Sequence, residues 1–216
     1  MSAADTLSGQ IARGIRSFSG QRFDGADLSG SDLSECVFTD CTFTGGNLKA
    51  AVITDTQFNK CRLSGANLSN IDGNSAQFRN CDLSNTLWNR SNLNGAKFLQ
   101  SKLTGADFAD CSLIGTDFEE CLLIAAFLPR ASFRNKTLTN MDFSEADLRE
   151  CDFRDTVFQD CRMRGATLRL SKFKGADLRG CDLGSLTFQD AAVLKGAIIC
   201  KSQATDILSG IGLQVL

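Results

Sequence analysis

The sequence predicts an all-β solenoid, in which the chain coils in short straight sides joined by corners. A large apolar residue falls on every fifth position from 18 to 198; of these 37 positions 16 are Leu and 15 are Phe, and only Gly73 has no side chain to bury. Two residues earlier, 31 of the 37 positions hold Ala, Cys, Ser, Thr or Gly. Positions two apart share one face of an extended segment, so the small and the large residue both point inward.

The period of five excludes the two ordinary regular structures. A continuous strand repeats every two residues and a helix every 3.6, so each unit must be a short extended side followed by a turn. Glycine often fills the last place of a unit, as at Gly25, Gly45 and Gly65. A turn at that place requires backbone dihedral angles that glycine adopts easily.

A second, slower period gives the number of sides. Phe recurs at positions 18, 38, 58, 78, 98 and 118, and again at 133, 153 and 173. A repeat of twenty residues predicts four sides per turn and about nine coils, with like residues stacked on like and the bore filled by side chains.

The two ends of the chain leave this pattern. Residues 1–15 predict either a short helix that covers the first coil or a frayed tail, and residues 16–200 form the repeat array. Residues 201–216 predict a C-terminal helix, which begins near Ser202 and ends at Gly212, followed by a dimerisation tail. Covering one coil would not need all of the tail's apolar residues, so we expect them to form a dimer seam: Ile207, Leu208, Ile211, Leu213, Val215 and Leu216.

The pattern falters at two places. At Ile71 and Gly73 the small and large residues are exchanged, which predicts a local bulge whose empty space Trp88 fills. Between residues 122 and 141, Lys136 takes a small-residue place, which predicts a distorted coil or an outward-turned lysine. Apolar residues also occupy outward places there, and they either form a partner patch or belong to a coil that folds Phe127 inside: Leu122, Ile124 and Phe127.

The composition argues against catalysis and against metal or cofactor binding. The chain has no His and no Tyr, and nine of its ten Cys fall on the small inward places, where they alternate with Ala and Ser. We therefore interpret them as unbonded packing residues. The stacked Cys41, Cys61 and Cys81 lack a fourth ligand for a zinc site, so we expect no catalytic, cofactor or metal residues.

Charge is distributed unevenly along the chain. Residues 21–125 hold eight Lys or Arg against thirteen Asp or Glu, whereas residues 126–200 hold twelve against ten. Two acidic clusters without intervening bases are candidate partner sites, with the alternative that their carboxylates serve the repeat's own turns. The clusters are Asp24, Asp27, Asp32, Glu35 and Asp40, and Asp107, Asp110, Asp117, Glu119 and Glu120.

Other partner classes fit the sequence less well. A net charge of −2 argues against direct nucleic-acid binding, because nucleic-acid-binding proteins usually carry a basic patch. Neither a signal peptide nor a membrane span is visible, since the longest apolar run, residues 122–128, is far shorter than the ~20 residues of a membrane helix. We expect a cytoplasmic protein that does not bind a membrane.

The repeats resemble those of the pentapeptide-repeat family, as in Ala26-Asp27-Leu28-Ser29-Gly30 and Ala176-Asp177-Leu178-Arg179-Gly180. The resemblance covers residues 16–200 and implies a right-handed quadrilateral β-helix. The tail, with Gln203-Ala204, Leu208, Gly212 and Val215, is similar to those of the quinolone-resistance Qnr proteins, MfpA and the microcin-immunity protein McbG. The unbroken register, without inserted loops, is nearest to MfpA.

That resemblance implies a non-enzymatic homodimer that binds DNA gyrase or topoisomerase IV and protects it from quinolones or related poisons. In such relatives an acidic rod imitates DNA; the near-neutral charge here allows only local mimicry. The alternative is a rigid scaffold that docks a different protein.

Overall fold

The computed structural model describes residues 3–186, 188–210 and 212–215. The chain is a right-handed quadrilateral β-helix of about eight turns with a short C-terminal helix, which confirms the predicted fold with about one turn fewer. It divides into two compact units, Met1–Cys121 and Leu122–Leu216, called unit 1 and unit 2 below.

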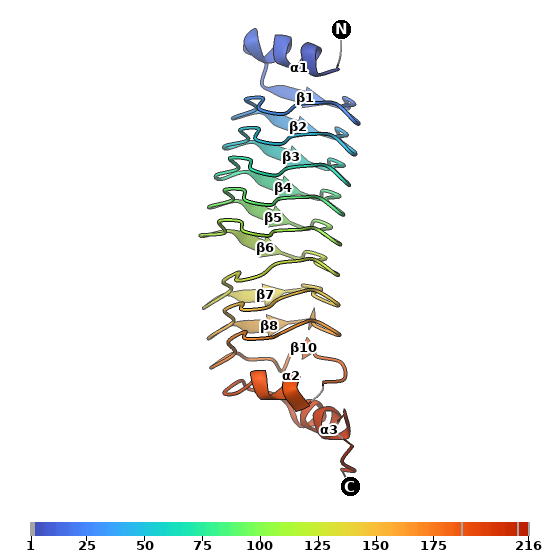
Figure 1. The fold of residues 1–216 in the computed structure, drawn as a ribbon, viewed down its shortest axis with the longest axis vertical. Helices are drawn as coiled ribbons and strands as arrows, with labels where there is room; N and C mark the ends of the chain where they lie inside the picture. The colour runs from blue at the N-terminus through green and yellow to red at the C-terminus, as the bar shows by residue number, and fades with distance from the viewer. Residues whose placement is uncertain (1–2, 187, 211, 216) are drawn as a thin grey trace. The chain divides into compact units, whose positions relative to one another are not determined.

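Unit 1 consists of a helix and a stack of coils (Figure 1). Helix α1 covers Ala3–Ala12, and strands β1 to β6 then form a parallel sheet in sequential order. Each residue pairs with the residue twenty further on, as Phe18 does with Phe38. The strands are β1 (Ser17–Ser19), β2 (Val37–Thr39), β3 (Gln57–Asn59), β4 (Gln77–Arg79), β5 (Lys97–Leu99) and β6 (Asp117–Glu119).

Three further ladders of parallel bridges run beside that sheet. They begin with the pairs Arg22 and Thr42, Asp27 and Asn47, and Asp32 and Val52, each again twenty residues apart. We number the sides by these ladders: side 1 carries β1 to β6, and sides 2, 3 and 4 follow along the chain. The predicted four sides are thereby confirmed.

Unit 2 repeats the arrangement and ends in two helices. The strands β7 (Thr137–Thr139) and β8 (Val157–Gln159) pair in parallel, as do β9 (Cys161–Arg162) and β10 (Cys181–Asp182). Bridges from Leu122, Phe127 and Ser132 to the residues twenty further on continue sides 2, 3 and 4. Helix α2 covers Phe188–Val193 and helix α3 covers Lys201–Gly210.

The core of unit 1 is a column of stacked aromatic rings. The six Phe of side 1 lie 5.0–5.2 Å apart from centroid to centroid. Rings of the third side meet this column edge-on, as Trp88 does with Phe78 at 5.3 Å. Parallel rungs set the stacking distance, because strands pair at about 4.8 Å. Offset and edge-on contacts are the arrangements that aromatic rings prefer.

The N-terminal segment forms the predicted helix rather than a tail. The α1 side chain Leu7 is completely buried, and Arg16 donates a hydrogen bond to the Ile11 carbonyl at 2.7 Å. The end of the first coil would otherwise present unpaired backbone groups and apolar side chains to water. Helix α1 therefore serves as a terminal cap of unit 1.

The bulge predicted at residues 71–75 is absent. The Gly73 amide donates a regular ladder hydrogen bond of 2.8 Å to the Asn92 carbonyl. A Cβ at Gly73 would lie 3.0 Å from Leu93 Cδ2 and 3.3 Å from Ile71 Cδ1. These two side chains therefore lie directly beside the space that Trp88 was predicted to fill. Ile71 fits a small-residue place because its neighbour on the large place is glycine.

The distortion predicted between residues 122 and 141 is also absent. The Lys136 amide donates to the Phe133 carbonyl at 3.1 Å and its carbonyl accepts from Val157 at 2.9 Å, as in the other coils. Lys136 is half-buried, whereas Met141 fits the core completely. The regular backbone thus accommodates Lys136, since a lysine can pack its aliphatic part and keep its charged end in water.

The repeat pattern ends earlier in the structure than in the sequence. Residues 16–200 were predicted to coil throughout, but α2 takes the place of two five-residue repeats. Ala191 and Ala192 favour a helix there. When the ladder resumes, Ile198 pairs with Asp177, a separation of 21 instead of twenty. This slip turns Ile198 outward, and 49% of its surface is exposed.

Helix α3 is fastened to the last coil by one buried amide. Gln203 Nε2 donates to the carbonyls of Leu178 and Cys181, both at 2.7 Å, and Gln203 Oε1 accepts from the Cys200 amide at 2.8 Å. The last of these satisfies a backbone amide at the N-terminus of the helix, which begins one residue before the predicted Ser202. Among the described residues no helix is long and apolar enough to cross a membrane.

Candidate protein-binding surfaces

The first acidic cluster is distributed around the coil instead of being gathered on one side. Asp24, Asp27 and Asp32 belong to sides 2, 3 and 4, and Glu35 and Asp40 stand at corners, with φ angles of 59° and 53°. Residues close in sequence diverge because every fifth residue begins a new side. A partner approaching one side therefore meets only part of this cluster.

Three of these carboxylates serve the repeat itself. Asp24 accepts hydrogen bonds from the Thr42 hydroxyl and the Thr44 amide, both at 2.8 Å. Asp27 accepts from the Ser29 amide at 3.1 Å and from Asn47 Nδ2 at 2.9 Å. Asp32 accepts from the Ser34 amide at 3.0 Å. These contacts agree with the alternative interpretation, in which the carboxylates stabilise the turns of the repeat.

Hydrogen bonds also keep these groups ionised. Those from Ser29 lower the pKa of Asp27, and those from Ser34 lower the pKa of Asp32. Burial acts in the opposite direction on Asp24, but the bonds from Thr42 and Thr44 outweigh it, and its pKa is also lowered. The carboxylates thus remain negative while they stabilise the coil.

The second acidic cluster is also divided between sides, with Asp110 at a corner where φ is 56°. Asp107 lies on side 3, where it accepts from the Ala109 amide and from Asn89 Nδ2, both at 2.9 Å. Asp117 and Glu119 project outward from β6 on side 1 and are exposed, and Glu120 follows directly. In the ladder Asp117 lies opposite Lys97.

Glu120 accepts a hydrogen bond from Gln100 Nε2 at 2.9 Å. The structure thus brings together Asp117, Glu119 and Glu120, one side of the predicted site. We call these three residues the β6 carboxylates.

The apolar group in unit 2 faces outward. Leu122 has 40% of its surface exposed, and Ile124 and Phe127 are half-buried. The Arg149 guanidinium lies 5.5 Å from the centroid of the Phe127 ring, a cation–π contact. Phe127 is therefore not folded into the core, which was the other sequence-based interpretation.

In unit 2, arginines form ion pairs with nearby aspartates, a pattern that the sequence analysis missed. Arg149, Arg154 and Arg179 each pair with the Asp two residues earlier, which lies on the same outward face. The side-chain hydrogen bond from Arg179 lowers the pKa of Asp177 to about 2. The recurrent Asp-x-Arg spacing is the sequence signal that could have revealed these pairs.

The cysteines are unbonded, as predicted. All ten are free thiols, and the Sγ atoms of Cys61 and Cys121 donate to core carbonyls at 3.3–3.4 Å. Burial raises the pKa of Cys111 and Cys151 to about 12 and that of Cys121 to about 11. Such thiols are poor nucleophiles.

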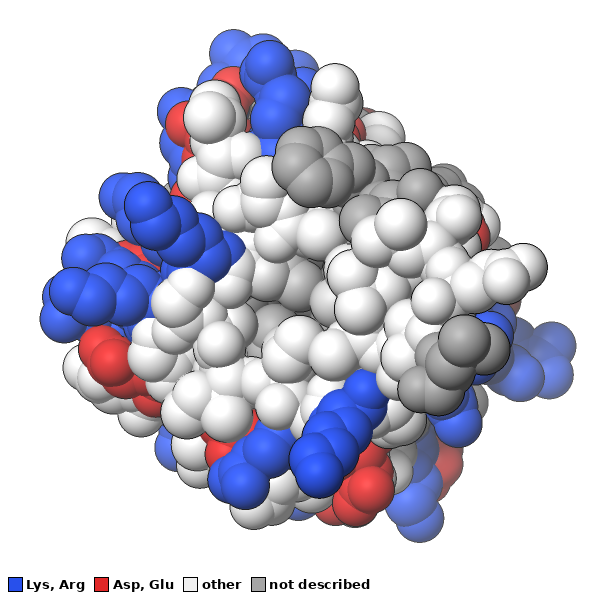
Figure 2. All heavy atoms as spheres, turned by 90° about the horizontal axis from the view of Figure 1, so that it is seen from below, with Lys and Arg blue, Asp and Glu red and all other residues white. Residues whose placement is uncertain are grey.

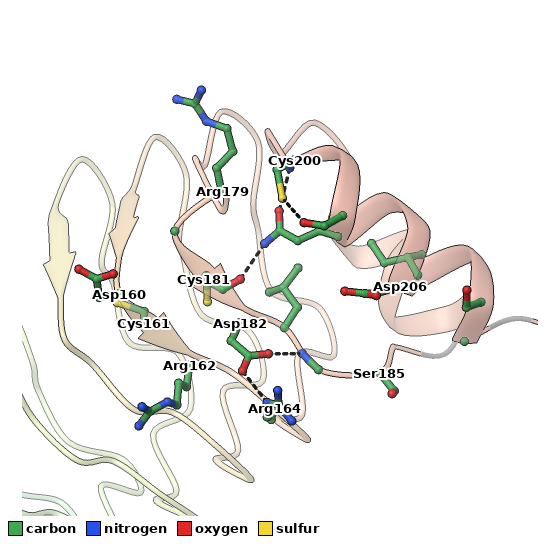
Figure 3. A pocket seen from close by; sticks show the side chains of 18 residues that line it. Asp160, Cys161, Arg162, Arg164, Arg179, Cys181, Asp182, Ser185, Cys200 and Asp206 are labelled. Carbon is green, nitrogen blue, oxygen red and sulfur yellow. Dashed lines mark hydrogen bonds and ion pairs between the residues drawn. The ribbon is translucent and has the colours of Figure 1, made fainter. Parts of the chain in front are cut away.

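Cys200 differs from the other cysteines. A hydrogen bond with the Ser202 hydroxyl lowers its pKa. It sits beside a groove of about 900 Å³ between the last coil and α3 (Figure 3).

Opposite charges within unit 2 compensate each other along that groove. Arg164 pairs with Asp182 at 2.5 Å, Arg162 with Asp142 at 3.4 Å, and Arg179 with Asp177 at 2.6 Å. The groove thus presents no excess of either sign.

The predicted dimerisation tail is largely exposed. Leu213 and Val215 have 54% and 46% of their surfaces exposed, Leu208 is exposed and Ile207 is half-buried. Ile211 and Leu216 lie outside the described residues. Seen from the end that carries α2 and α3, uncharged residues occupy the centre, with Lys and Arg towards the rim (Figure 2).

Comparison with known families agrees with this architecture. The sequence matches "Pentapeptide repeat region" over residues 17–86 and "Pentapeptide repeats (8 copies)" over residues 74–110, 101–140, 137–169 and 146–184. The chain belongs to the pentapeptide-repeat family. A sequence search among curated proteins gave no match.

Solved structures of QnrB1 share the fold. Full-length QnrB1, a plasmid-mediated fluoroquinolone resistance protein, is 20% identical over 91% of this chain and 97% of its own, with a TM-score of 0.61. A trypsin-treated QnrB1 variant is 20% identical over 93% and 97%, with a TM-score of 0.50. HetL from the cyanobacterium Nostoc, involved in heterocyst differentiation regulation, is 20% identical over 85% and 97%, with a TM-score of 0.42.

Proposed function

We propose that this pentapeptide-repeat protein is a cytoplasmic, non-enzymatic protein that binds DNA gyrase or topoisomerase IV and protects it from quinolones or related poisons. The observation that carries the proposal is the set of β6 carboxylates: Asp117 and Glu119 point outward from one strand, and Glu120 follows at the corner. We propose a topoisomerase as the partner because the tail is similar to those of Qnr proteins and because QnrB1 is a fluoroquinolone resistance protein.

The charge of unit 1 fits a basic protein surface. Unit 1 has fourteen Asp or Glu and ten Lys or Arg. Duplex DNA carries one negative charge per ~1.7 Å, so unit 1 imitates only a short stretch of phosphates. Exposed carboxylates attract basic groups over about 10 Å at 0.1 M salt, and affinity should therefore decrease as salt increases.

Neutralising the β6 carboxylates is expected to weaken protection of the enzyme. In a supercoiling assay with a quinolone, the unchanged protein should preserve activity, and Asp117→Asn, Glu119→Gln and Glu120→Gln together should raise the concentration needed by about tenfold or more. The matched control changes Glu145→Gln, Glu150→Gln and Asp160→Asn, three exposed acids of unit 2. If the unchanged protein neither protects nor inhibits, and does not bind the enzyme at low salt, the proposal fails.

We also propose that two copies associate through the tail. Leu213 and Val215 expose apolar surface at an end whose centre is uncharged, as a two-fold seam requires. Light scattering of the unchanged chain should give the mass of a dimer, and Leu213→Ser with Val215→Ser should give that of a monomer. The control Leu87→Ser, also an exposed leucine but in unit 1, should stay dimeric. A monomeric unchanged chain would refute the seam.

A second candidate function is a scaffold for a protein other than a topoisomerase. The outward apolar group of Leu122, Ile124 and Phe127 favours it, because solvent-facing positions of a repeat protein are usually polar. If Leu122→Ser leaves the affinity for a topoisomerase unchanged, this apolar surface does not take part in the binding proposed for the β6 carboxylates.

A further inference from the structure

The corner at Leu170 is unfavourable for the folded protein in two respects. Its φ angle is 64°, in the left-handed region, and 62% of its surface is exposed. Left-handed backbone favours Gly, Asn and Asp. Among the described non-glycine residues with positive φ, all except Leu170 are polar, charged or alanine. Because neither the backbone conformation nor the exposure of Leu170 stabilises the fold, its side chain is a candidate for a contact with another molecule.

Three exposed cations lie within four residues of this leucine. Arg169 precedes it on side 3, and Lys172 and Lys174 follow on side 4. Within the described part of the chain none of the three has an acidic group within ion-pair distance. One coil earlier, by contrast, Arg149 and Arg154 are bound to Asp147 and Asp152.

The carboxylates near these cations compensate them only in part. Lys172 lies beside Asp152 in the ladder of side 4. Both oxygens of Asp152 already accept hydrogen bonds from Arg154, at 2.8 and 2.5 Å. Asp147, whose pKa is lowered by its hydrogen bond with Arg149 and also by Arg169, is likewise bound by Arg149, and the exposed Glu150 stands at the corner one coil earlier. Three cations against Glu150 leave an excess of positive charge near Leu170, on a backbone that ladder hydrogen bonds hold to the preceding coil.

We propose that Arg169, Leu170, Lys172 and Lys174 form a docking surface for an acidic segment of a partner protein. The partner's carboxylates pair with the three cations, and an apolar side chain of the partner covers Leu170. A nucleic acid would satisfy the cations through its phosphates, but its backbone offers no apolar group to the leucine. An apolar centre within a charged rim is the usual anatomy of a protein interface.

This surface is distinct from the one proposed to bind a topoisomerase. The β6 carboxylates belong to unit 1 and require a basic partner, whereas the Leu170 surface belongs to unit 2 and requires an acidic one. The two proposals therefore stand or fall separately.

The test uses the full chain and defined probes. Fluorescence anisotropy at low salt would compare a labelled peptide of repeated Glu-Glu-Leu-Gly units, the same peptide with Ser for Leu, and a short DNA duplex. The leucine peptide should bind most tightly. Arg169→Gln, Lys172→Gln and Lys174→Gln together should weaken both peptides by about tenfold or more. The charge-matched control is Lys60→Gln, Arg79→Gln and Arg90→Gln, exposed cations of unit 1, which should leave binding unchanged.

The leucine is tested by a change that the fold accepts. Leu170→Asn places at this corner the residue found at the left-handed corners Asn70, Asn80 and Asn135. It should abolish the preference for the leucine peptide, while the thermal midpoint stays at least as high as that of the unchanged protein. Equal binding of both peptides, tighter binding of the duplex, or self-association that the same variants disrupt would each overturn the proposal.

Discussion

Replacing Phe98 by alanine is expected to lower the free energy of unfolding by about 3–5 kcal/mol. Phe98 is completely buried and stacks between Phe78 and Phe118, each at 5.0 Å. It also meets Trp88 and Phe108 edge-on at 5.6 and 6.0 Å. The cavity cannot collapse, because the ladders fix the distance between rungs. Urea denaturation followed by circular dichroism measures the loss.

The control is Cys61→Ala in the same unit. Cys61 is equally buried, but alanine occupies corresponding places at Ala51, Ala66 and Ala76. The thiol contributes only weak hydrogen bonds, of 3.4 Å to the carbonyls of Phe38 and Asn59. A loss of about 1 kcal/mol is expected. Similar losses for Phe98→Ala and Cys61→Ala would mean that the aromatic column is not the principal source of stability.

The fold was predictable because one short period sets the whole architecture. An inward residue on every fifth position requires a corner in every unit, and the recurrence of Phe at twenty residues requires four sides. Local exceptions were misjudged for the same reason. The sequence analysis compared Gly73 only with the other large-residue positions. The space beside it is shared with Ile71, which lies on the same side, and with Leu93, one coil further on.

The candidate site was less predictable, because adjacency in a solenoid is not adjacency in sequence. Asp24, Asp27 and Asp32 form a cluster in the sequence but lie on three sides, while Asp117 has Lys97 as a neighbour across the ladder. Outward positions tolerate many residues, so the repeat does not reveal which of them make contacts. Leu170 attracts attention only when its backbone conformation is known.

The end of the array depends on contacts that the repeat pattern does not encode. The sequence predicted a helix over the last coil, but the role of Gln203 followed only from the structure. Its amide donates to the Leu178 and Cys181 carbonyls and accepts from the Cys200 amide; the Leu178 carbonyl accepts in addition from the Cys181 amide at 2.9 Å. An apolar face alone would not have satisfied these backbone groups.

Gln203→Ala is therefore expected to lower the free energy of unfolding by about 1–3 kcal/mol, because the Cys181 carbonyl loses its donor, while the Leu178 carbonyl keeps the Cys181 amide. The control Gln214→Ala removes an exposed amide and should have almost no effect. Thermal and urea denaturation measure both variants. Limited proteolysis should show α3 of the Gln203 variant cleaved first, since the helix would detach from the last coil.

Gln203→Glu distinguishes the hydrogen bonds from simple packing. The new carboxylate would keep the volume and the bond from Cys200, but when ionised it would face two carbonyl oxygens without a proton to donate. Burial among acceptors raises the folded-state pKa of such a group above its unfolded value. The stability of this variant relative to the unchanged protein should thus be greatest below the unfolded pKa and fall as the pH rises through the folded pKa. A pH-independent difference would show that Gln203 acts by filling space and not by binding the two carbonyls.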